Sequence, residues 1–261
     1  MDKLKLTGHI KDIDLKNKMF RLIDKVNLCL KNYEVQKSEF LNPYEIKNAL
    51  SVLNYNKDIN YTIDGGYENS ERSVVFIYPF YMDYNDIDSK LDILQIDGNF
   101  KFKEVLHKDY LGSILGLGIK REKIGDILVN DNFCQVIVDN DISDFLIFNL
   151  NKIGKNNISI KHIEKEDLKM PNINYKEVNT TISSKRLDCV ISGIYNISRQ
   201  ESIKYISSER VFVDYEKIIS PSKLIEDTCL ISVRGKGRII VSEIGELTKK
   251  EKVKLKIKII T

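Results

Sequence analysis

Residues 184–238 read SKRLDCVISGIYNISRQESIKYISSERVFVDYEKIISPSKLIEDTCLISVRGKGR, and this stretch predicts two short helices followed by strands. Four apolar residues of the first helix recur at steps of three and four, which places them on one face: Leu187, Val190, Ile191 and Ile194. Ser198 follows a turn and is placed to cap the second helix through its hydroxyl group. Apolar runs at 211–215 and 229–233 predict strands after the helix pair.

The same stretch carries cations where both helices begin and where the last two strands turn. Helix N-termini expose unpaired amides and the positive end of the helix dipole, so basic residues there favour an RNA backbone. The candidate RNA-binding residues are Lys185, Arg186, Ser198, Arg199, Ser202, Lys204, Arg210, Arg234, Lys236 and Arg238. For residues 234–238, which alternate cations with glycines, a flexible hairpin with a solvated tip is the alternative.

The basic charge of the chain is concentrated in its C-terminal part. The 261 residues carry a net charge of +3, but residues 183–261 hold 16 Lys and Arg against 10 Asp and Glu. Residues 1–182 hold 25 basic residues against 28 acidic ones. This asymmetry favours a polyanionic partner for the C-terminal part, with a merely solvated basic face as the alternative.

Composition argues against a membrane protein and against a metal site. No apolar run approaches the ~18 residues of a membrane helix, and the N-terminus is charged from Asp2 onward. The four cysteines stand singly among apolar neighbours and form no C-x-x-C pair: Cys29, Cys134, Cys189 and Cys229. We therefore expect free thiols in a reducing cytoplasm, without zinc or another cofactor.

The N-terminal part predicts a small, mostly helical domain over residues 1–80. One apolar seam runs along residues 12–33, and a second helix begins at Asn42, with Pro43 in its first turn and Glu45 placed to complete a capping box. A short strand is expected at 59–63.

Residues 81–165 predict a second domain with the order β-α-β-β-α-β. This order is the ferredoxin-like topology shared with RNA-recognition-motif (RRM) domains. Residues 166–182, rich in polar side chains, are expected to form a linker, and residues 183–261 a third domain that closes with an alternating strand. The fold class is therefore α+β.

A second basic stretch lies in this middle domain, around HKDYLG and KREK. It predicts a possible second RNA contact at His107, Lys108, Lys120, Arg121 and Lys123. The alternative is structural, with Arg121 and Glu122 pairing with Asp126 to hold a loop. Use of His107 as a general base is disfavoured because no second histidine, metal-ligand cluster or activated nucleophile accompanies it, so no catalytic residue is expected.

The C-terminal stretch resembles the RNA-binding domain named after ribosomal protein S-four. The matching segments are Arg186-Leu187-Asp188, Ser198-Arg199, Val211-Phe212-Val213-Asp214 and Ile231-Ser232-Val233-Arg234-Gly235. The chain departs from that family at Glu209-Arg210, where a glycine is usual, and at Asp227-Thr228, where Gly-Asp is usual. The resemblance implies an S-four-type αL domain, in which a helix pair on a small sheet binds structured RNA.

Residues 107–127, HKDYLGSILGLGIKREKIGDI, resemble the hallmark of the YlmH family of bacterial proteins. Gly65-Gly66-Tyr67-Glu68, Glu71-Arg72 and Pro79 match its N-terminal signature, although Ser70 stands where the family tends to have alanine. The resemblance implies a non-enzymatic, monomeric factor in ribosome-associated quality control of stalled translation. Its partners would be the large ribosomal subunit with its RNA, peptidyl-tRNA and other quality-control factors.

Two rival functions remain. Pseudouridine synthases also combine an S-four domain with an Arg-Leu-Asp tripeptide, but in a Gly-Arg-Leu-Asp context that Thr and Gly-Leu-Leu follow. Here Arg186-Leu187-Asp188 follows Lys185 and precedes CVISG, inside the expected binding helix. The other rival is a protein-binding scaffold linked to cell division, which weak and salt-insensitive association with ribosomal particles would favour.

Overall fold

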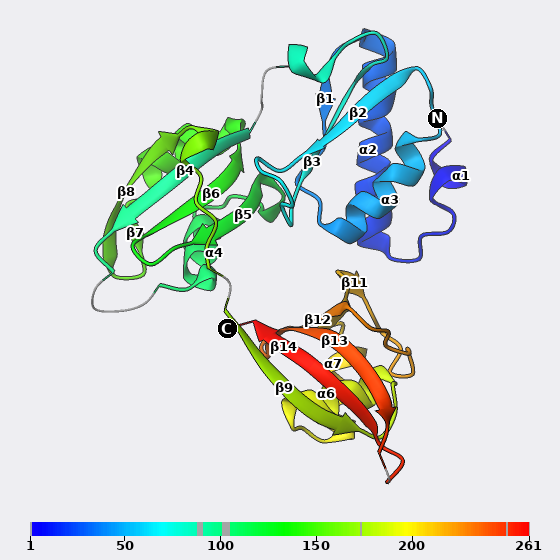
Figure 1. Cartoon of the computed structure of the whole chain (residues 1–261). Helices are drawn as coiled ribbons and strands as arrows, with labels where there is room; N and C mark the ends of the chain where they lie inside the picture. The colour runs from blue at the N-terminus through cyan, green and yellow to red at the C-terminus, as the bar shows by residue number, and fades with distance from the viewer. Residues whose placement is uncertain (1, 88–90, 101–104, 173, 249, 261) are drawn as a thin grey trace. The chain divides into compact units, whose positions relative to one another are not determined.

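The structure is a computed structural model that describes residues 2–87, 91–100, 105–172, 174–248 and 250–260 (Figure 1). The chain divides into two compact units, Met1–Pro171 and Asn172–Thr261, and each unit combines helices with antiparallel sheets. The α+β class is therefore as predicted.

The N-terminal part of the first unit contains a sheet as well as helices. Its elements are α1 (Lys3–Thr7), α2 (Ile13–Asn32), β1 (Gln36–Lys37), α3 (Pro43–Leu53), β2 (Ile59–Asp64), β3 (Val74–Pro79) and the 3-10 turn η1 (Tyr84–Asp86). The strands pair in the order β1-β3-β2. The prediction of a mostly helical domain missed β3, because all six of its residues are buried and its apolar run has no alternation.

Both long helices begin as the sequence predicts. The Asp12 side chain accepts a hydrogen bond from the Leu15 amide, and Asn42 and Glu45 form a reciprocal capping box. The apolar seam of α2, with Met19, Leu22 and Val26 fully or almost fully buried, packs in one core with residues of α3 and β3.

The middle part of the first unit has the predicted β-α-β-β-α-β order with one short strand added. Its elements are β4 (Leu91–Gly98), α4 (His107–Gly116), η2 (Arg121–Lys123), β5 (Ile124–Val129), β6 (Phe133–Asp139), η3 (Asn140–Ile142), α5 (Ser143–Asn149), β7 (Lys152–Ile153), β8 (Asn156–Ile163) and η4 (Lys165–Asp167). The sheet order is β5-β6-β4-β8-β7, so β4 and β6 lie at its centre.

The two faces of this five-stranded sheet pack in different hydrophobic clusters. Leu94, Ile96 and Val136 belong to the core that also contains Tyr110 and Ile114 of α4. The opposite face belongs to another cluster, in which Leu91, Ile93, Leu128 and Ile137 join Phe40, Val74 and Phe76 from the N-terminal part. This shared core explains why residues 1–171 form one unit, whereas the sequence predicted separate domains over 1–80 and 81–165.

The second unit is a six-stranded antiparallel sheet with two helices. Its elements are β9 (Tyr175–Ile182), α6 (Leu187–Tyr195), α7 (Arg199–Ser207), β10 (Val211–Val213), β11 (Glu216–Lys217), β12 (Cys229–Val233), β13 (Gly237–Leu247) and β14 (Val253–Ile260). The strand order is β11-β10-β12-β13-β14-β9. The predicted linker over 166–182 is wrong in its last part, because residues 175–182 form β9 and pair with β14 along their whole length.

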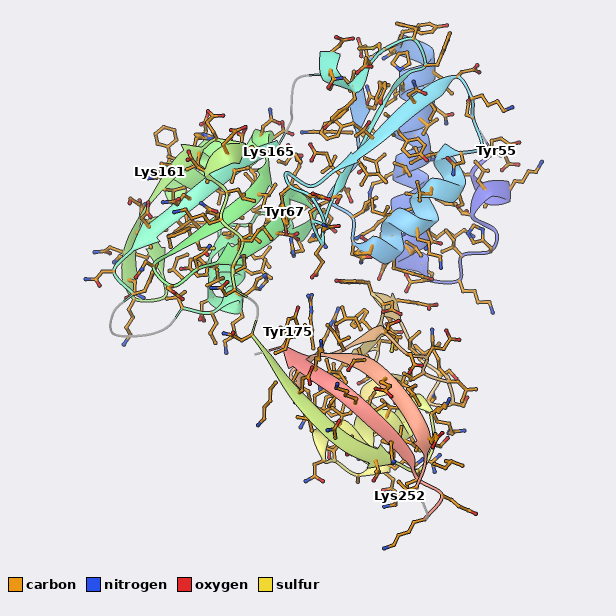
Figure 2. All side chains as sticks on the ribbon, in the orientation of Figure 1. Tyr55, Tyr67, Lys161, Lys165, Tyr175 and Lys252 are labelled. Carbon is orange, nitrogen blue, oxygen red and sulfur yellow. The ribbon has the colours of Figure 1, made fainter. Side chains whose placement is uncertain are left out.

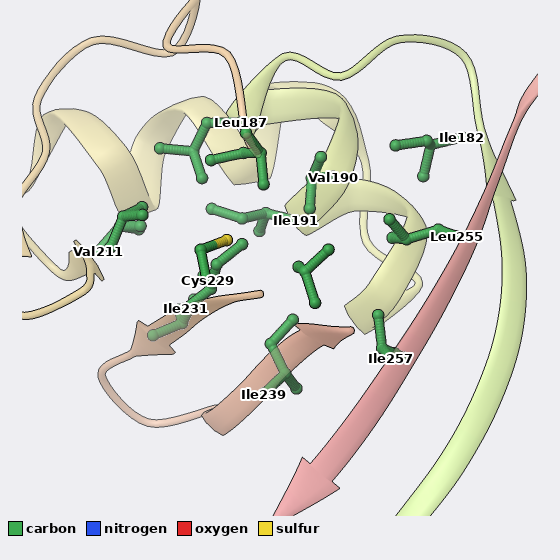
Figure 3. Close-up of a cluster of buried hydrophobic side chains, with 14 of the residues drawn as sticks. Ile182, Leu187, Val190, Ile191, Val211, Cys229, Ile231, Ile239, Leu255 and Ile257 are labelled. Carbon is green, nitrogen blue, oxygen red and sulfur yellow. The ribbon is translucent and has the colours of Figure 1, made fainter. Parts of the chain in front are cut away.

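The core of this unit lies between the helix pair and one face of the sheet. Figure 3 shows Leu187, Val190 and Ile191 of α6 facing Ile231 and Ile239 of the central strands, with Leu255 and Ile257 of β14 beside them. The described parts of the chain contain no helix that is both long and apolar enough to cross a membrane. All four cysteines are buried and free, as predicted.

Candidate nucleic-acid interface

One buried carboxylate organises the start of both helices of the second unit. Asp188, in the first turn of α6, is fully buried, and it accepts hydrogen bonds from Arg186 Nε and Nη2 (both 3.1 Å) and from Arg199 Nε (2.9 Å). Burial alone would raise the pKa of Asp188, but the hydrogen bonds and charges of the two arginines outweigh it and lower the pKa to about 2. The carboxylate therefore stays ionised and fixes both guanidinium groups.

The two arginines keep part of their hydrogen-bonding capacity for a ligand. Their side chains are 37% and 56% exposed, whereas Asp188 is completely covered. A guanidinium group has five N–H donors, of which Asp188 takes two from Arg186 and one from Arg199. The group of three has a net charge of +1 and can bind a phosphate oxygen through the donors that remain.

The other predicted residues of the helix pair fall into two classes. Lys185, Ser198 and Lys204 are exposed, and the Ser198 hydroxyl caps α7 by accepting from the Glu201 amide (3.1 Å). Ser202 is fully buried and donates to the Ser198 carbonyl (3.2 Å). The prediction that Ser202 contacts RNA is therefore wrong, because its hydroxyl is used inside the helix.

The four remaining cations gather with aromatic rings around the turn between β12 and β13. The guanidinium group of Arg210 lies 4.6 Å from the Tyr205 ring and donates to the Arg234 carbonyl (2.8 Å). Three further cation–ring pairs follow: Arg234 over Phe212 (5.1 Å), Lys236 over Tyr205 (5.9 Å) and Arg238 over Tyr215 (5.9 Å). All four cations are exposed.

These rings were not predicted as parts of the site. For Phe212 the signal lies in the alternation of β10, where Val211 and Val213 are buried in the core and Phe212 lies on the other face. No such alternation marks Tyr205, which is in α7, or Tyr215, which is outside the strands. The turn itself requires glycine, since Gly235 and Gly237 have φ values of +84° and +101°. The amides of Arg234 and Lys236 in this turn donate to the carbonyls of Arg210 and Val233. The flexible-tip alternative for residues 234–238 is therefore not favoured.

The predicted second RNA contact is only partly available. Arg121 donates to the carbonyls of Ile124 and Gly125, and burial lowers the pKa of its guanidinium to about 10. Lys123 bonds the carboxylates of Asp139 (2.9 Å) and Asp141 (3.0 Å). Both residues therefore serve contacts inside the first unit. His107, Lys108 and Lys120 are exposed.

The loop-holding role foreseen for Asp126 is present, but with other partners. Asp126 accepts from the Tyr67 hydroxyl (2.7 Å) and from the amides of Glu71 (2.6 Å) and Arg72 (3.0 Å). Burial raises the pKa of Asp126 in spite of these hydrogen bonds. Arg72 adds bonds from Nε to the Ile124 carbonyl (3.1 Å) and from Nη2 to the Phe40 carbonyl (2.8 Å).

The stretch around Tyr67, labelled in Figure 2, is thus connected to the 121–126 segment by partly buried hydrogen bonds. These are the two segments that carry the resemblance to the YlmH family. Their residues hold the N-terminal and middle parts of the unit together through these hydrogen bonds, so the role of the two segments is structural.

The sheet face on which RRM domains stack bases is covered in this chain. Gln135 of β6 is fully buried, donates to Gln95 Oε1 and to the Asp167 carbonyl (both 3.1 Å), and accepts from the Lys169 amide (2.7 Å). Ile93 and Ile137 on the same face pack in the core shared with Phe40 and Phe76. An RRM stacks bases on exposed aromatic residues of its central strands. On this face β4 has no aromatic residue, and the aromatic residue of β6, Phe133, is half-buried and has the Lys169 ammonium group 5.7 Å from its ring.

Comparisons with known proteins agree with the resemblance. A family model described as "YlmH, N-terminal" matches residues 15–82, and one described as "Putative RNA-binding domain in YlmH" matches residues 85–167. The ribosome-associated protein quality control protein P2 of Bacillus subtilis (strain 168) is 32% identical over 220 residues, covering 84% of this chain and 85% of that protein.

A solved structure, the cell division protein ylmH from Streptococcus pneumoniae, has a similar fold. The match has a TM-score of 0.51 with 22% sequence identity, and it covers 60% of this chain and 96% of the other.

Proposed function

The chain belongs to the YlmH family, and from this premise we propose that it binds RNA of the large ribosomal subunit in quality control of stalled translation. The name of the Bacillus subtilis relative, ribosome-associated protein quality control protein P2, supports the ribosomal setting. In this proposal the protein is a cytoplasmic monomer without catalytic activity, and ribosomal RNA and peptidyl-tRNA are its partners.

The observation that carries RNA binding is the pair of arginines held by Asp188 at the two helix starts. A buried carboxylate that fixes two partly exposed guanidinium groups is an arrangement suited to phosphate, because the donors are in place before the ligand arrives. Arg210, Arg234, Lys236 and Arg238 add exposed charge in the same unit. Phosphate contacts of this kind supply most of the affinity for RNA.

The environment of Asp188 also speaks against the pseudouridine synthase alternative. An aspartate that attacks a base must reach the substrate, but Asp188 has no exposed surface and both its oxygens accept from arginines. This environment supports a binding role for Asp188 and its two arginines.

The test of this function is co-sedimentation with purified large ribosomal subunits. Replacing Arg186 and Arg199 alone would leave the Asp188 carboxylate buried without a cation, which is itself destabilising. We therefore choose D188N/R186Q/R199Q/K204Q, which removes the charges together. The matched control K31Q/K57Q gives the same change in net charge at two exposed lysines of the first unit. The quadruple variant should dissociate from the subunits at moderate salt while the control remains bound.

A salt titration of ribosome binding distinguishes the proposed RNA binding from the alternative of a protein-binding scaffold linked to cell division. Binding of the unmodified chain should weaken steeply as salt rises, because phosphate contacts release counterions. A flat response to salt, or full binding of the quadruple variant, would contradict the proposal and favour a protein partner.

A further inference from the structure

The second unit has one sheet face that its helices leave uncovered. Figure 1 shows β9, β14 and β13 in front of α6 and α7, which pack on the other face. Strand β14 alternates strictly: Val253, Leu255 and Ile257 are buried in the core, so Lys254, Lys256 and Lys258 lie on the outer face. The three lysines form a column, here called the lysine column, with a spacing of about 7 Å between neighbours.

Neighbouring strands extend this basic surface. Arg238 and Phe212 lie on the outer face, since the positions beside them in β13 and β10, Ile239 and Val213, belong to the core. The Lys258 ammonium group lies 5.9 Å from the ring of Tyr175, which begins β9 and is 46% exposed.

The outer face also holds two carboxylates, and they do not neutralise it. Glu177 of β9 lies 3.7 Å from both Lys256 and Lys258, and Glu243 pairs with Lys256 in the strand register. The lysine column and Arg238 together leave an excess of two positive charges over these two acids. Since Lys256 and Lys258 remain 43% and 39% exposed, the face keeps cations available to an anionic ligand.

We propose that this outer face binds an extended single-stranded segment of RNA. The lysine column would follow successive phosphates, whose separation along an extended strand is comparable to the column's spacing. Tyr175 at one end of β9 offers a ring on which a base can stack; Figure 2 shows it at the opposite end of the β9–β14 pair from Lys252.

This proposal rests on the proposed RNA-binding function and extends it, because it adds a second RNA surface to the same unit. The arginines held by Asp188 belong to the helix pair, which packs on the other face of the sheet. A single short RNA segment cannot cover both faces. The second unit would then hold two RNA segments at once, one on the helix pair and one on the lysine column.

The test uses the full chain, a fluorescent oligouridine and purified large ribosomal subunits. The variant K254Q/K256Q/K258Q removes the lysine column without touching the core. The matched control K11Q/K31Q/K57Q removes three exposed lysines of the N-terminal part, outside residues 85–167. We expect the column variant to bind oligouridine at least several-fold more weakly than the control. Its slope of log affinity against log salt should also be smaller by about 2.

Three outcomes would overturn the proposal or separate it from the proposed function. Equal oligouridine affinity and salt slope for both lysine variants would overturn it. If the quadruple variant D188N/R186Q/R199Q/K204Q leaves the ribosomal subunits while the column variant binds RNA normally, only this inference fails. If neither variant weakens any binding, the proposed function fails as well.

Discussion

Asp188 and its two arginines combine a structural and a functional role in one hydrogen-bonded group. The carboxylate is buried at the start of α6, and without a cationic partner such a group costs several kcal/mol. The arginines stabilise it and remain partly exposed for a ligand. The sequence could predict the positions of the cations, because helix starts are readable from capping residues and periodicity. It could not predict the burial of Ser202, which lies one turn before Ile206 on the face of α7 that packs into the core.

The first prediction concerns the pH dependence of this group. The pKa of Asp188 is lowered from 3.8 to about 2 in the folded chain, so its ionised form stabilises the fold by ~2 kcal/mol above pH ~5. This contribution is lost as the pH falls through the folded pKa. The stability difference between the unmodified chain and D188N, measured by urea unfolding of the second unit, should fall to about half between pH 7 and pH 3. A difference that does not change with pH would contradict the lowered pKa.

At the scale of elements, β3 and β9 show what limited the sequence-based prediction. Helices α2, α3 and α7 begin at side-chain caps, and α2, α3 and α6 have regular apolar faces, so all four were found. Strand β3 is buried on both faces and has no alternation. Strand β9 is an edge strand whose exposed positions are polar, and its partner β14 lies more than 70 residues away in the chain. Only that distant pairing makes residues 175–182 a strand.

The second prediction concerns the loop that Asp126 holds. D126A removes the acceptor for the Glu71 and Arg72 amides and for the Tyr67 hydroxyl, so it should destabilise the first unit by ~3 kcal/mol. The graded control Y67F loses one of these three bonds and should cost ~1 kcal/mol. Hydrogen exchange of peptides from β3 and β5 measures both effects. Equal protection in D126A and the unmodified chain would show that the connection between the two parts does not depend on this carboxylate.

At the scale of the whole chain, the protein consists of two units with different roles and not of three independent domains. The first unit uses its family-typical segments to join two parts through a common core, and this closes the sheet face that an RRM would offer to RNA. Four exposed cations with aromatic partners lie in the second unit, and in the first unit the exposed Lys169 lies over the Phe133 ring. On the proposed function we expect residues 172–261 to carry most of the RNA binding, which the quadruple variant tests.

The third prediction tests whether residues 1–171 unfold as one unit. Phe40 is fully buried in the shared core, and its ring lies so close to Gly125 that no Cβ atom would fit there. F40A should destabilise the first unit by ~4 kcal/mol, because a large cavity opens where β3, β5 and β6 meet. In hydrogen exchange, β2, β3, β4 and β6 should all lose protection together, whereas α6 and β12 of the second unit should keep theirs. F148A, which truncates a phenylalanine that is 77% exposed, is the matched control and should change stability by less than ~0.5 kcal/mol. Loss of protection in β2 and β3 alone would mean that the N-terminal and middle parts unfold independently, so that the RRM-like sheet face could open to RNA.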